Sequence, residues 1–314
     1  MIPILRSTIV ACAVLSTAHA ADTIWSDDFE ASAKEAAAAN KPLIVEFIGS
    51  DWCGFCRKLE KDVFSTEEFK EGVKGKYVFV QLDLPNDKSR ISPENLQRNL
   101  QLKEKFAAEG MPTILFLDGA GKPFAHTGYA PVGPGVYLQH FESLSGLREM
   151  RDKAFAEAAK LEGMDKAKML MRGLAMMNLG EVLLDRFYAD EIGFIKSIDP
   201  KDEAGFFKGM RQKKMVMDYQ RNINSFISKK KFKEAHGITD AMIETSGFKG
   251  VMLQQFVIIR GRLHAYEGNP NKALEVLEEA RVIAPESKLC KEIDKLKEQI
   301  SAKKAGEKTE KAVQ

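Results

Sequence analysis

The sequence predicts an α/β domain, a sheet flanked by helices, followed by a region made of helices alone. Up to about residue 150, short apolar runs of strand length alternate with stretches whose apolar residues recur at helical spacing. Beyond it the strand pattern disappears and only the helical spacing continues. The chain of 314 residues is long enough for two domains. We therefore expect a first domain at residues 21–150 and an all-helical domain at residues 151–300.

Apolar runs and turn residues set the expected order of elements in the first domain. Lys41-Pro42 ends an alanine-rich helix, and Asp118-Gly119-Ala120-Gly121 predicts a hairpin turn. Ser65-Thr66-Glu67-Glu68 has the form of a capping box, and Ser92-Pro93 pairs an N-cap residue with proline at the first helical position. The expected strands are 43–48, 77–82, 113–117 and 122–127; the expected helices are 27–40, one from the cysteines to 64, a short one after the capping box, 93–110 and 134–146.

Two cysteines, Cys53 and Cys56, mark the candidate site. They follow the strand at 43–48 directly and precede a helical stretch. A strand that turns into a helix at such a pair places the first thiol at the helix N-terminus, where unpaired amides and the helix dipole favour a thiolate. The second thiol lies one turn further, close enough to form a disulfide. This arrangement supports thiol–disulfide exchange and needs no cofactor.

Two other uses of a C-x-x-C pair fit the sequence less well. A zinc knuckle needs two further ligands at suitable spacing, and the remaining cysteines, Cys12 and Cys290, begin no second pair. A purely structural disulfide usually closes a long loop, because short loops constrain the unfolded chain least. We therefore expect redox chemistry at this pair and no metal site.

The first twenty residues have the form of a secretory signal peptide. Arg6 is their only charge, an apolar stretch runs from Ile9 to Leu15, and Ala18-His19-Ala20 has the form of a cleavage site. A lipobox ending at Cys12 would leave too short an apolar stretch before the cysteine. No later segment is long and apolar enough to span a bilayer. We expect export across the inner membrane to the periplasm, where disulfides persist.

The charge balance indicates whether nucleic acid is a partner, and the composition of the C-terminal end indicates how well that end is ordered. Lys and Arg together number 47 against 45 Asp and Glu, so the chain presents no basic field aimed at nucleic acid. Residues 301–314 are largely Lys, Glu and Ala, with no large apolar residue before Val313. We expect a flexible charged tail there, either a frayed helix or disordered.

Residues from about Ile24 to Met150 resemble a thioredoxin fold. The resemblance rests on Trp52-Cys53-Gly54-Phe55-Cys56-Arg57-Lys58 together with Gly110-Met111-Pro112-Thr113 further along the chain. Either motif alone is weak, whereas the two together are specific. Within the superfamily the chain is most similar to exported thioredoxin-like proteins with a Ser-Asp-Trp-Cys-Gly-x-Cys signature. The resemblance implies a central mixed sheet flanked by helices and a redox-active Cys53–Cys56 disulfide.

Met111 and Pro112 form the second part of the implied site. The resemblance implies a cis Met111–Pro112 peptide bond beside the disulfide, with the backbone before the proline offered to an extended substrate. A trans proline that simply begins a strand is the alternative. Met111 departs from the Thr, Val or Ile usual in the family, and its flexible thioether suits varied apolar partners.

Glu46 is an unexpected acid inside an apolar strand. Thioredoxins carry a buried acid here that helps to deprotonate the second cysteine, and Glu46 fits that role toward Cys56. The spacing differs from thioredoxin, because one more residue separates Glu46 from Cys53. The alternative is a carboxylate near the strand end, paired with a lysine or wetted by solvent.

Trp52, Gly54 and Phe55 are the remaining candidates for substrate contact. Trp52 resembles the tryptophan that shields the family's site, although an indole also serves as a packing residue. Phe55 is expected to face outward from the exposed cap of the helix. Because Phe55 offers no charge to the Cys53 thiolate, the Gly54-Phe55 dipeptide does not fix the redox potential.

The helical region is rich in methionine and resembles tetratricopeptide repeats. Its methionines are expected to fill helix–helix contacts, a binding groove being the alternative. One stretch matches the small-residue and proline positions of a repeat, and two earlier stretches match poorly. The matching positions are Gly261, Gly268, Ala273, Ala280 and Pro285. Such a domain is expected to hold a protein partner, to dimerise or to cap the first domain.

The sequence supports two hypotheses of function. The first is an exported thiol–disulfide oxidoreductase in which Cys53 attacks a disulfide of a protein substrate and Cys56 resolves the mixed disulfide. Its direction is open, and a reductase would need a membrane electron donor. The second is a non-enzymatic binding or assembly protein whose helical domain holds the partner. Cys290 is expected to be buried rather than a second redox site.

Overall fold

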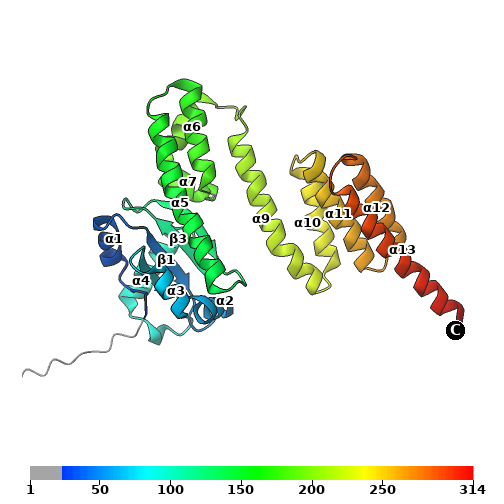
Figure 1. The fold of residues 1–314 in the computed structure, drawn as a ribbon, viewed down its shortest axis with the longest axis horizontal. Helices are drawn as coiled ribbons and strands as arrows, with labels where there is room; N and C mark the ends of the chain where they lie inside the picture. The colour runs from blue at the N-terminus through cyan, green and yellow to red at the C-terminus, as the bar shows by residue number, and fades with distance from the viewer. Residues whose placement is uncertain (1–22, 178, 314) are drawn as a thin grey trace, which may run out of the picture. The chain divides into compact units, whose positions relative to one another are not determined.

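The computed structural model describes residues 23–177 and 179–313. The predicted signal peptide, residues 1–20, lies outside the described residues. The contacts within the chain divide it into two compact units, Met1–Phe194 and Ile195–Gln314. Figure 1 traces the first unit from blue to green and the helices of the second unit from yellow-green to red.

A mixed four-stranded sheet forms the centre of the first unit. The strands lie in the order β2-β1-β3-β4: β2 (Val78–Asp83), β1 (Leu43–Ile48), β3 (Thr113–Leu117) and β4 (Pro123–Gly128). β1 pairs in parallel with β2 and antiparallel with β3, and β3 forms a hairpin with β4. Every residue of β1 is buried, because the strand lies inside the sheet. The sheet and its flanking helices confirm the predicted α/β thioredoxin fold class.

The α-helices up to residue 158 follow the order that the sequence predicts, and further helices come after them along the chain. In chain order, the helices and helical turns are α1 (Phe29–Ala38), α2 (Gly54–Leu59), the π-helical turn η1 (Glu60–Phe64), α3 (Glu67–Val73), the 3₁₀ turn η2 (Lys88–Arg90), α4 (Pro93–Lys105), α5 (Pro134–Ala158), α6 (Gly163–Met176), α7 (Glu181–Phe187) and α8 (Ala189–Ile198), which crosses the division between the units (Figure 1).

Two caps differ in detail from the sequence prediction. Thr66 rather than Ser65 is the N-cap of α3, and its hydroxyl accepts a hydrogen bond from the Phe69 amide at 3.3 Å. α4 ends at Lys105, before the predicted stop at Gly110, because Ala107 adopts a positive φ of 49° that no helix continues through.

α5 is longer than the sequence predicts. It continues past Gly146 to Ala158, because the residues after this glycine include no further glycine or proline and are mostly good helix formers. The domain boundary that the sequence places at residue 150 therefore lies inside a helix. The compact units divide further along the chain, after Phe194.

Buried Arg151 connects α5 with the sheet and with the helices that follow. Its guanidinium forms an ion pair with Asp118 at 2.8 Å, at the turn between β3 and β4. It also donates to the Tyr188 hydroxyl at 2.7 Å, and that hydroxyl donates to the Pro123 carbonyl at 2.8 Å. Phe187 stacks on Phe106 with ring centroids 5.4 Å apart. These contacts make the segment up to α8 part of the first unit.

The second unit is a series of helices in which each packs against the next. They are α9 (Phe206–Ser228), α10 (Phe232–Thr245), α11 (Gly250–Tyr266), α12 (Pro270–Ile283) and α13 (Cys290–Val313) (Figure 1). Ala273 and Ala280 are fully buried, and a Cβ on Gly261 would lie 3.0 Å from Leu277 Cγ, so small residues allow α11 and α12 to approach closely. The unit confirms the predicted all-helical region. Its assignment to tetratricopeptide repeats stays a prediction.

The C-terminal end is helical in the structure. α13 continues through residues 301–313, where the sequence predicts a frayed helix or disorder, and the Lys, Glu and Ala of this segment are good helix formers. In the part of the chain that the structure describes, no helix combines the length and the apolar character needed to cross a bilayer.

Candidate active site

Cys53 and Cys56 lie at the start of α2, where β1 turns into the helix. They form a disulfide with Cα atoms 5.3 Å apart. Cys53 is the N-cap of α2, and its Sγ accepts a hydrogen bond from the Cys56 amide at 3.1 Å. Both residues are only 4% exposed. The first sulfur therefore occupies the position at which the helix N-terminus stabilises negative charge.

Two side chains in the loop before the cysteines explain its shape. The Ser50 amide and hydroxyl both donate to the carboxylate of Asp83, at 2.9 and 2.6 Å. The Asp51 carboxylate accepts the amides of Asp87 and Asn86, at 2.8 and 2.9 Å, and these hydrogen bonds lower the pKa of Asp51. The loop is thus fastened to the chain that follows β2, which fixes the place where α2 begins.

Trp52 and Phe55 present aromatic surface beside the disulfide. Trp52 is 45% exposed, and its Nε1 donates to the Leu84 carbonyl at 2.9 Å. Its indole covers Gly49 so closely that a Cβ there would lie 2.1 Å from the ring. Phe55 is 57% exposed, as predicted for the helix cap, and stacks on Tyr129 with centroids 4.9 Å apart. The sequence analysis did not single out Tyr129, although it directly follows Gly128 at the end of the last strand.

Met111, the residue before Pro112, lies against the same disulfide. The peptide bond between them is cis. Met111 packs on the cluster formed by Ile48, Cys53 and Cys56, so the structure brings the two motifs of the sequence together. A Cβ on Gly128 would lie only 2.9 Å from the Pro112 carbonyl oxygen, and this close approach requires a glycine at the end of β4.

Glu46 is buried in the middle of the sheet. It is 1% exposed and accepts a hydrogen bond from Gln81 Nε2 on β2 at 2.9 Å. Burial raises the pKa of Glu46 to about 8; the Gln81 hydrogen bond opposes this rise, and the negative charge of Glu60 adds to it. The partner is an amide rather than a lysine, and the position is not at the strand end. Glu46 is therefore neither paired with a lysine nor exposed to solvent near the strand end, which was the alternative left open by the sequence.

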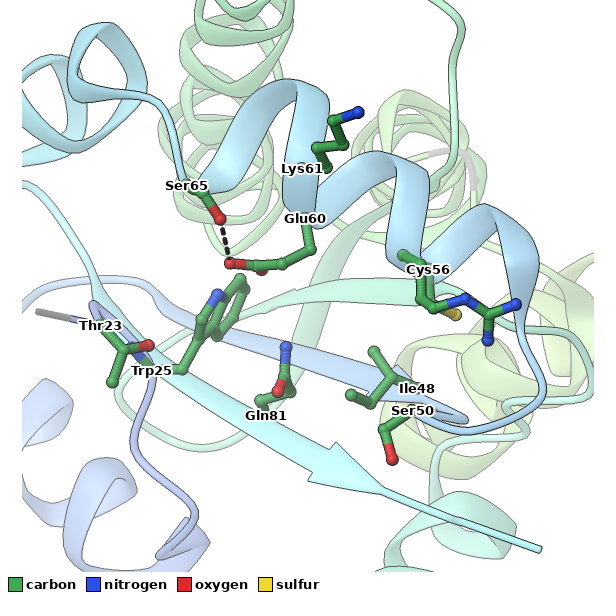
Figure 2. A pocket seen from close by; sticks show the side chains of 10 residues that line it. Thr23, Trp25, Ile48, Ser50, Cys56, Glu60, Lys61, Ser65 and Gln81 are labelled. Carbon is green, nitrogen blue, oxygen red and sulfur yellow. Dashed lines mark hydrogen bonds between the residues drawn. The ribbon is translucent and has the colours of Figure 1, made fainter. Parts of the chain in front are cut away.

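A cavity of about 540 Å³ opens behind Cys56, and Figure 2 shows the side chains around it. Gln81, Trp25 and Glu60 line the cavity, and Glu60 belongs to η1, the turn after α2. The Glu60 Oε1 accepts a hydrogen bond from Ser65 Oγ at 2.6 Å. Its Oε2 and the Trp25 Nε1 are buried and have no hydrogen-bond partner among the described residues. The cavity wall also includes Thr23, Ile48, Ser50, Arg57 and Lys61.

This cavity was not predicted from the sequence. Glu60, an acid one helical turn after Cys56, was the residue that could have indicated a polar environment behind the helix. Trp25 gives no comparable signal, because only the fold brings it to the disulfide region. The cavity wall includes both Cys56 and Gln81, whose amide donates to Glu46.

The described residues also show whether a metal could bind near the disulfide and where Cys290 lies. Around the disulfide, the described residues contain no group of three side chains arranged to bind a metal ion. Cys290 is buried and free, and its Sγ donates to the Pro285 carbonyl at 3.2 Å. The prediction that Cys290 is a buried residue is confirmed.

Comparison with known proteins locates the family match in the first unit. The model of the thioredoxin-like domain family matches residues 29–134. The chain is 33% identical over 109 residues to the disulfide bond reductase DsbH of Chlamydia pneumoniae, covering 35% of this chain and 65% of DsbH. It is 36% identical over 95 residues to the thioredoxin-related protein DsbJ of Chlamydia pneumoniae, covering 30% of this chain and 27% of DsbJ.

These matches cover only part of each protein. The chain spans less than two thirds of the length of both curated relatives. A solved structure described as the DsbH oxidoreductase is 26% identical, with a TM-score of 0.37, and covers 46% of this chain and 93% of that one. The chain therefore carries a thioredoxin-like domain at residues 29–134, joined to a helical region that the family match does not reach.

Proposed function

We propose that this chain is a thiol–disulfide oxidoreductase that is exported to the periplasm and acts on protein substrates through Cys53 and Cys56. One observation carries the proposal: the two cysteines are joined as a disulfide at the N-terminus of α2, inside a thioredoxin-like domain. Relatives named as a disulfide bond reductase and as thiol:disulfide interchange proteins support the same chemistry.

The exchange proceeds in two balanced steps. In the reducing direction, the Cys53 thiolate attacks one sulfur of a substrate disulfide, and the other substrate sulfur leaves as a thiolate that takes up a proton. Cys56 then loses its proton and attacks the Cys53 sulfur, which releases the second substrate thiolate. The substrate disulfide gains two electrons and the pair becomes oxidised. The same steps in reverse form a disulfide in the substrate.

The helix N-terminus favours Cys53 as the attacking group. Its sulfur lies at the N-cap and already accepts the Cys56 amide, and both features stabilise the thiolate relative to the thiol. Cys56 lies one turn inside and is reached through the cavity behind the helix. This asymmetry assigns attack to Cys53 and resolution to Cys56.

Glu46 is the proposed proton acceptor for Cys56. Its pKa of about 8 lies close to the ~8.5 of an ordinary cysteine, so a proton passes between the two groups with little free-energy cost. Gln81 holds the carboxylate and also borders the cavity beside Cys56. A cavity with unpartnered polar atoms has room and hydrogen-bonding groups for solvent, which provides a route for the proton.

The substrate is proposed to dock on the surface around the disulfide. Trp52 and Phe55 offer exposed aromatic faces, and nothing lies within 4 Å of a Cβ built on Gly54, so backbone there is open to a partner. Met111 packs on the disulfide and is joined to Pro112 by a cis peptide bond. This surface suits an extended, partly apolar segment of a protein chain. The helical region is proposed to bind a protein partner or a second copy.

The reduction potential of the pair tests the proposal and assigns its direction. We expect equilibration with glutathione buffers to give a value near the ~−270 mV of thioredoxin, because a relative of which the chain covers 65% is named a disulfide bond reductase. A membrane electron donor would then be required. A value of ~−120 to −180 mV would assign disulfide formation or repair instead.

A trapping experiment separates exchange from simple binding. The Cys56→Ala variant is expected to retain protein substrates as mixed disulfides on Cys53, whereas Cys53→Ala retains none. Cys290→Ala is the control, since that thiol is buried away from solvent. If the double variant Cys53→Ser/Cys56→Ser keeps full partner binding and cellular activity, the chain is a binding or assembly protein and the proposal is wrong.

A further inference from the structure

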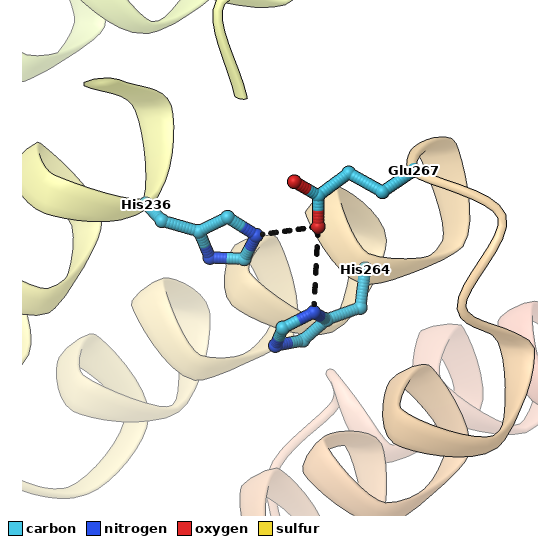
Figure 3. Close-up of side chains that lie close together, drawn as sticks. All are labelled: His236, His264 and Glu267. Atoms are coloured by element: carbon cyan, nitrogen blue, oxygen red, sulfur yellow. Dashed lines mark hydrogen bonds and ion pairs between the residues drawn. The ribbon is translucent and has the colours of Figure 1, made fainter. Parts of the chain in front are cut away.

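Two histidines and a glutamate meet where α10 begins and α11 ends, as Figure 3 shows. His236 belongs to the first turns of α10, His264 to the last turn of α11, and Glu267 is the C-cap of α11. Glu267 Oε2 lies 3.0 Å from His236 Nε2 and 3.6 Å from His264 Nδ1. The imidazole centroids are 4.5 Å apart. Three potential metal ligands from two helices thus converge on one point.

We propose that His236, His264 and Glu267 form a zinc-binding site that joins α10 to α11. Two imidazole nitrogens and one carboxylate oxygen are a ligand set that Zn²⁺ uses, and three protein ligands leave a fourth position for water. This site departs from the expectation, drawn from the sequence, of a chain without metal. Sequence spacing gave no sign of it, because His236 and His264 lie on different helices.

The two separations from Glu267 fit tetrahedral zinc. With metal–ligand bonds of about 2.0–2.1 Å, neighbouring ligand atoms in such a site lie about 3.4 Å apart. The two separations from Glu267, 3.0 and 3.6 Å, lie on either side of that value. All three ligand atoms lie within 4.8 Å of one another, so closing the site needs only small rotations of the imidazoles.

The surroundings shield the site partly and leave it reachable from solvent. The side chains of His236, His264 and Glu267 are 17%, 21% and 25% exposed. The nearby cations are already paired: Arg260 with Glu279 at 2.8 Å, and Lys272 with Glu275 at 2.6 Å. Their pairing reduces the repulsion that a divalent cation would meet.

Binding would fasten the α10–α11 hairpin at its end. Metal that binds the folded unit and not the unfolded chain raises the apparent stability in proportion to the logarithm of its concentration. An ion pair among the same three residues, with no metal, is the competing explanation. The two differ in whether Zn²⁺ binds stoichiometrically.

Zinc titration of the untagged full chain by isothermal calorimetry decides between them. The chain is kept oxidised, so that Cys53 and Cys56 cannot serve as ligands. We expect one Zn²⁺ per chain, a higher melting temperature of the helical unit with Zn²⁺, and no such effect of Mg²⁺. Loss of a partner one shell further out typically weakens metal binding 10–100-fold, so His236→Ala, His264→Ala and Glu267→Gln should each weaken it at least about 100-fold.

His140→Ala is the matched control. His140 is a solvent-accessible histidine of the first unit that contacts Thr127 Oγ1 at 2.9 Å, and its loss should leave zinc affinity unchanged. Absence of saturable zinc binding, or binding that survives the three ligand substitutions, would overturn the proposal. If His236→Ala fails to fold, the nearly isosteric Glu267→Gln decides. Thiol–disulfide exchange at Cys53 and Cys56 should persist in the Glu267→Gln variant. Loss of zinc binding and loss of oxidoreductase activity are therefore measured independently, and one proposal can fail without the other.

Discussion

Gln81 Nε2 on β2 donates a hydrogen bond of 2.9 Å to the carboxylate of Glu46, the one acid buried inside β1. The amide supplies a single neutral partner to a group that burial has removed from water. A neutral donor cannot offset the cost of desolvating a charge, so the pKa of Glu46 rises to about 8. Most Glu46 carboxyls are therefore protonated at neutral pH, and the fraction that is ionised and can accept the Cys56 proton grows as the pH rises toward 8.

Glu46→Gln should change how stability depends on pH. The folded-state pKa of about 8 lies above the ordinary 4.5, so the folded chain binds one more proton than the unfolded chain between these values. The free energy of unfolding therefore falls as pH rises, by up to about 1.4 kcal/mol per unit from about pH 5 to about pH 8. The variant should lose this slope, because glutamine stays neutral. Urea unfolding of the oxidised chain at several pH values measures it.

Tryptophan fluorescence makes this measurement report on the first unit, which contains Glu46. The chain has two tryptophans, Trp25 and Trp52, and both lie in the first unit. Glu67→Gln, an exposed acid in the first turn of α3, serves as the control and should keep the wild-type slope. An unchanged slope in Glu46→Gln would show that Glu46 ionises normally.

Glu60→Gln should lower the pKa of Glu46. The negative charge of Glu60 raises the pKa of Glu46. The uncharged glutamine amide removes this contribution while keeping the size of the side chain. The pH at which the exchange rate rises should therefore move downward, and the stability slope should end at a lower pH. Stopped-flow reduction of a model disulfide over pH 6–10 gives the first quantity. A shift upward, or none, would mean that Glu60 does not sense the charge of Glu46.

Gly128→Ala should weaken both the first unit and its activity. The added Cβ would lie 2.9 Å from the Pro112 carbonyl oxygen, which is backbone and cannot rotate away, so the segment beside the disulfide must shift. Overpacking of this kind typically costs about 1–3 kcal/mol. Urea unfolding gives the stability and disulfide reduction gives the rate. Gly146→Ala in α5 is the opposite control: its Cβ meets nothing within 4 Å, and helix propensity predicts a gain of about 0.5–1 kcal/mol.

The sequence predicts the elements of the first unit well because their signals are local. The strands at 43–48 and 113–117 follow from apolar runs and match β1 and β3 residue for residue. The C-x-x-C pair at a strand-to-helix turn likewise needs no distant information. The apolar neighbours of Glu46 suggested burial, but the sequence left a solvated position near the strand end open, and the pairing of β1 inside the sheet decides between the two.

Features that depend on tertiary contacts could not be predicted in this way. Trp25 and Tyr129 reach the disulfide region only through the folded sheet. His236 and Glu267 meet because two helices pack, which no short spacing encodes. Arg151 stands at the start of the region predicted as a second domain, yet it is 5% exposed because Asp118 and Tyr188 pair with it in the folded first unit.

Arg151→Ala should therefore destabilise the first unit strongly. Its removal leaves the Asp118 carboxylate, only 9% exposed, without its cation, and breaking a buried pair of this kind typically costs about 3–5 kcal/mol. The Tyr188 hydroxyl also loses its donor from the guanidinium. Unfolding in urea, followed by tryptophan fluorescence, measures the loss. Asp118→Asn in the same background should recover part of it, because the uncompensated charge is then removed.

Lys160→Ala provides the matched comparison for this loss. Lys160 pairs with Glu157 at 2.8 Å just after the end of α5, but both side chains are largely exposed, and solvent screening leaves such pairs little effect on stability. The difference between the two variants isolates the effect of burial from that of charge. If Arg151→Ala costs no more than Lys160→Ala, α5 is not fastened to the sheet through this residue, and a domain boundary near residue 150 would regain support.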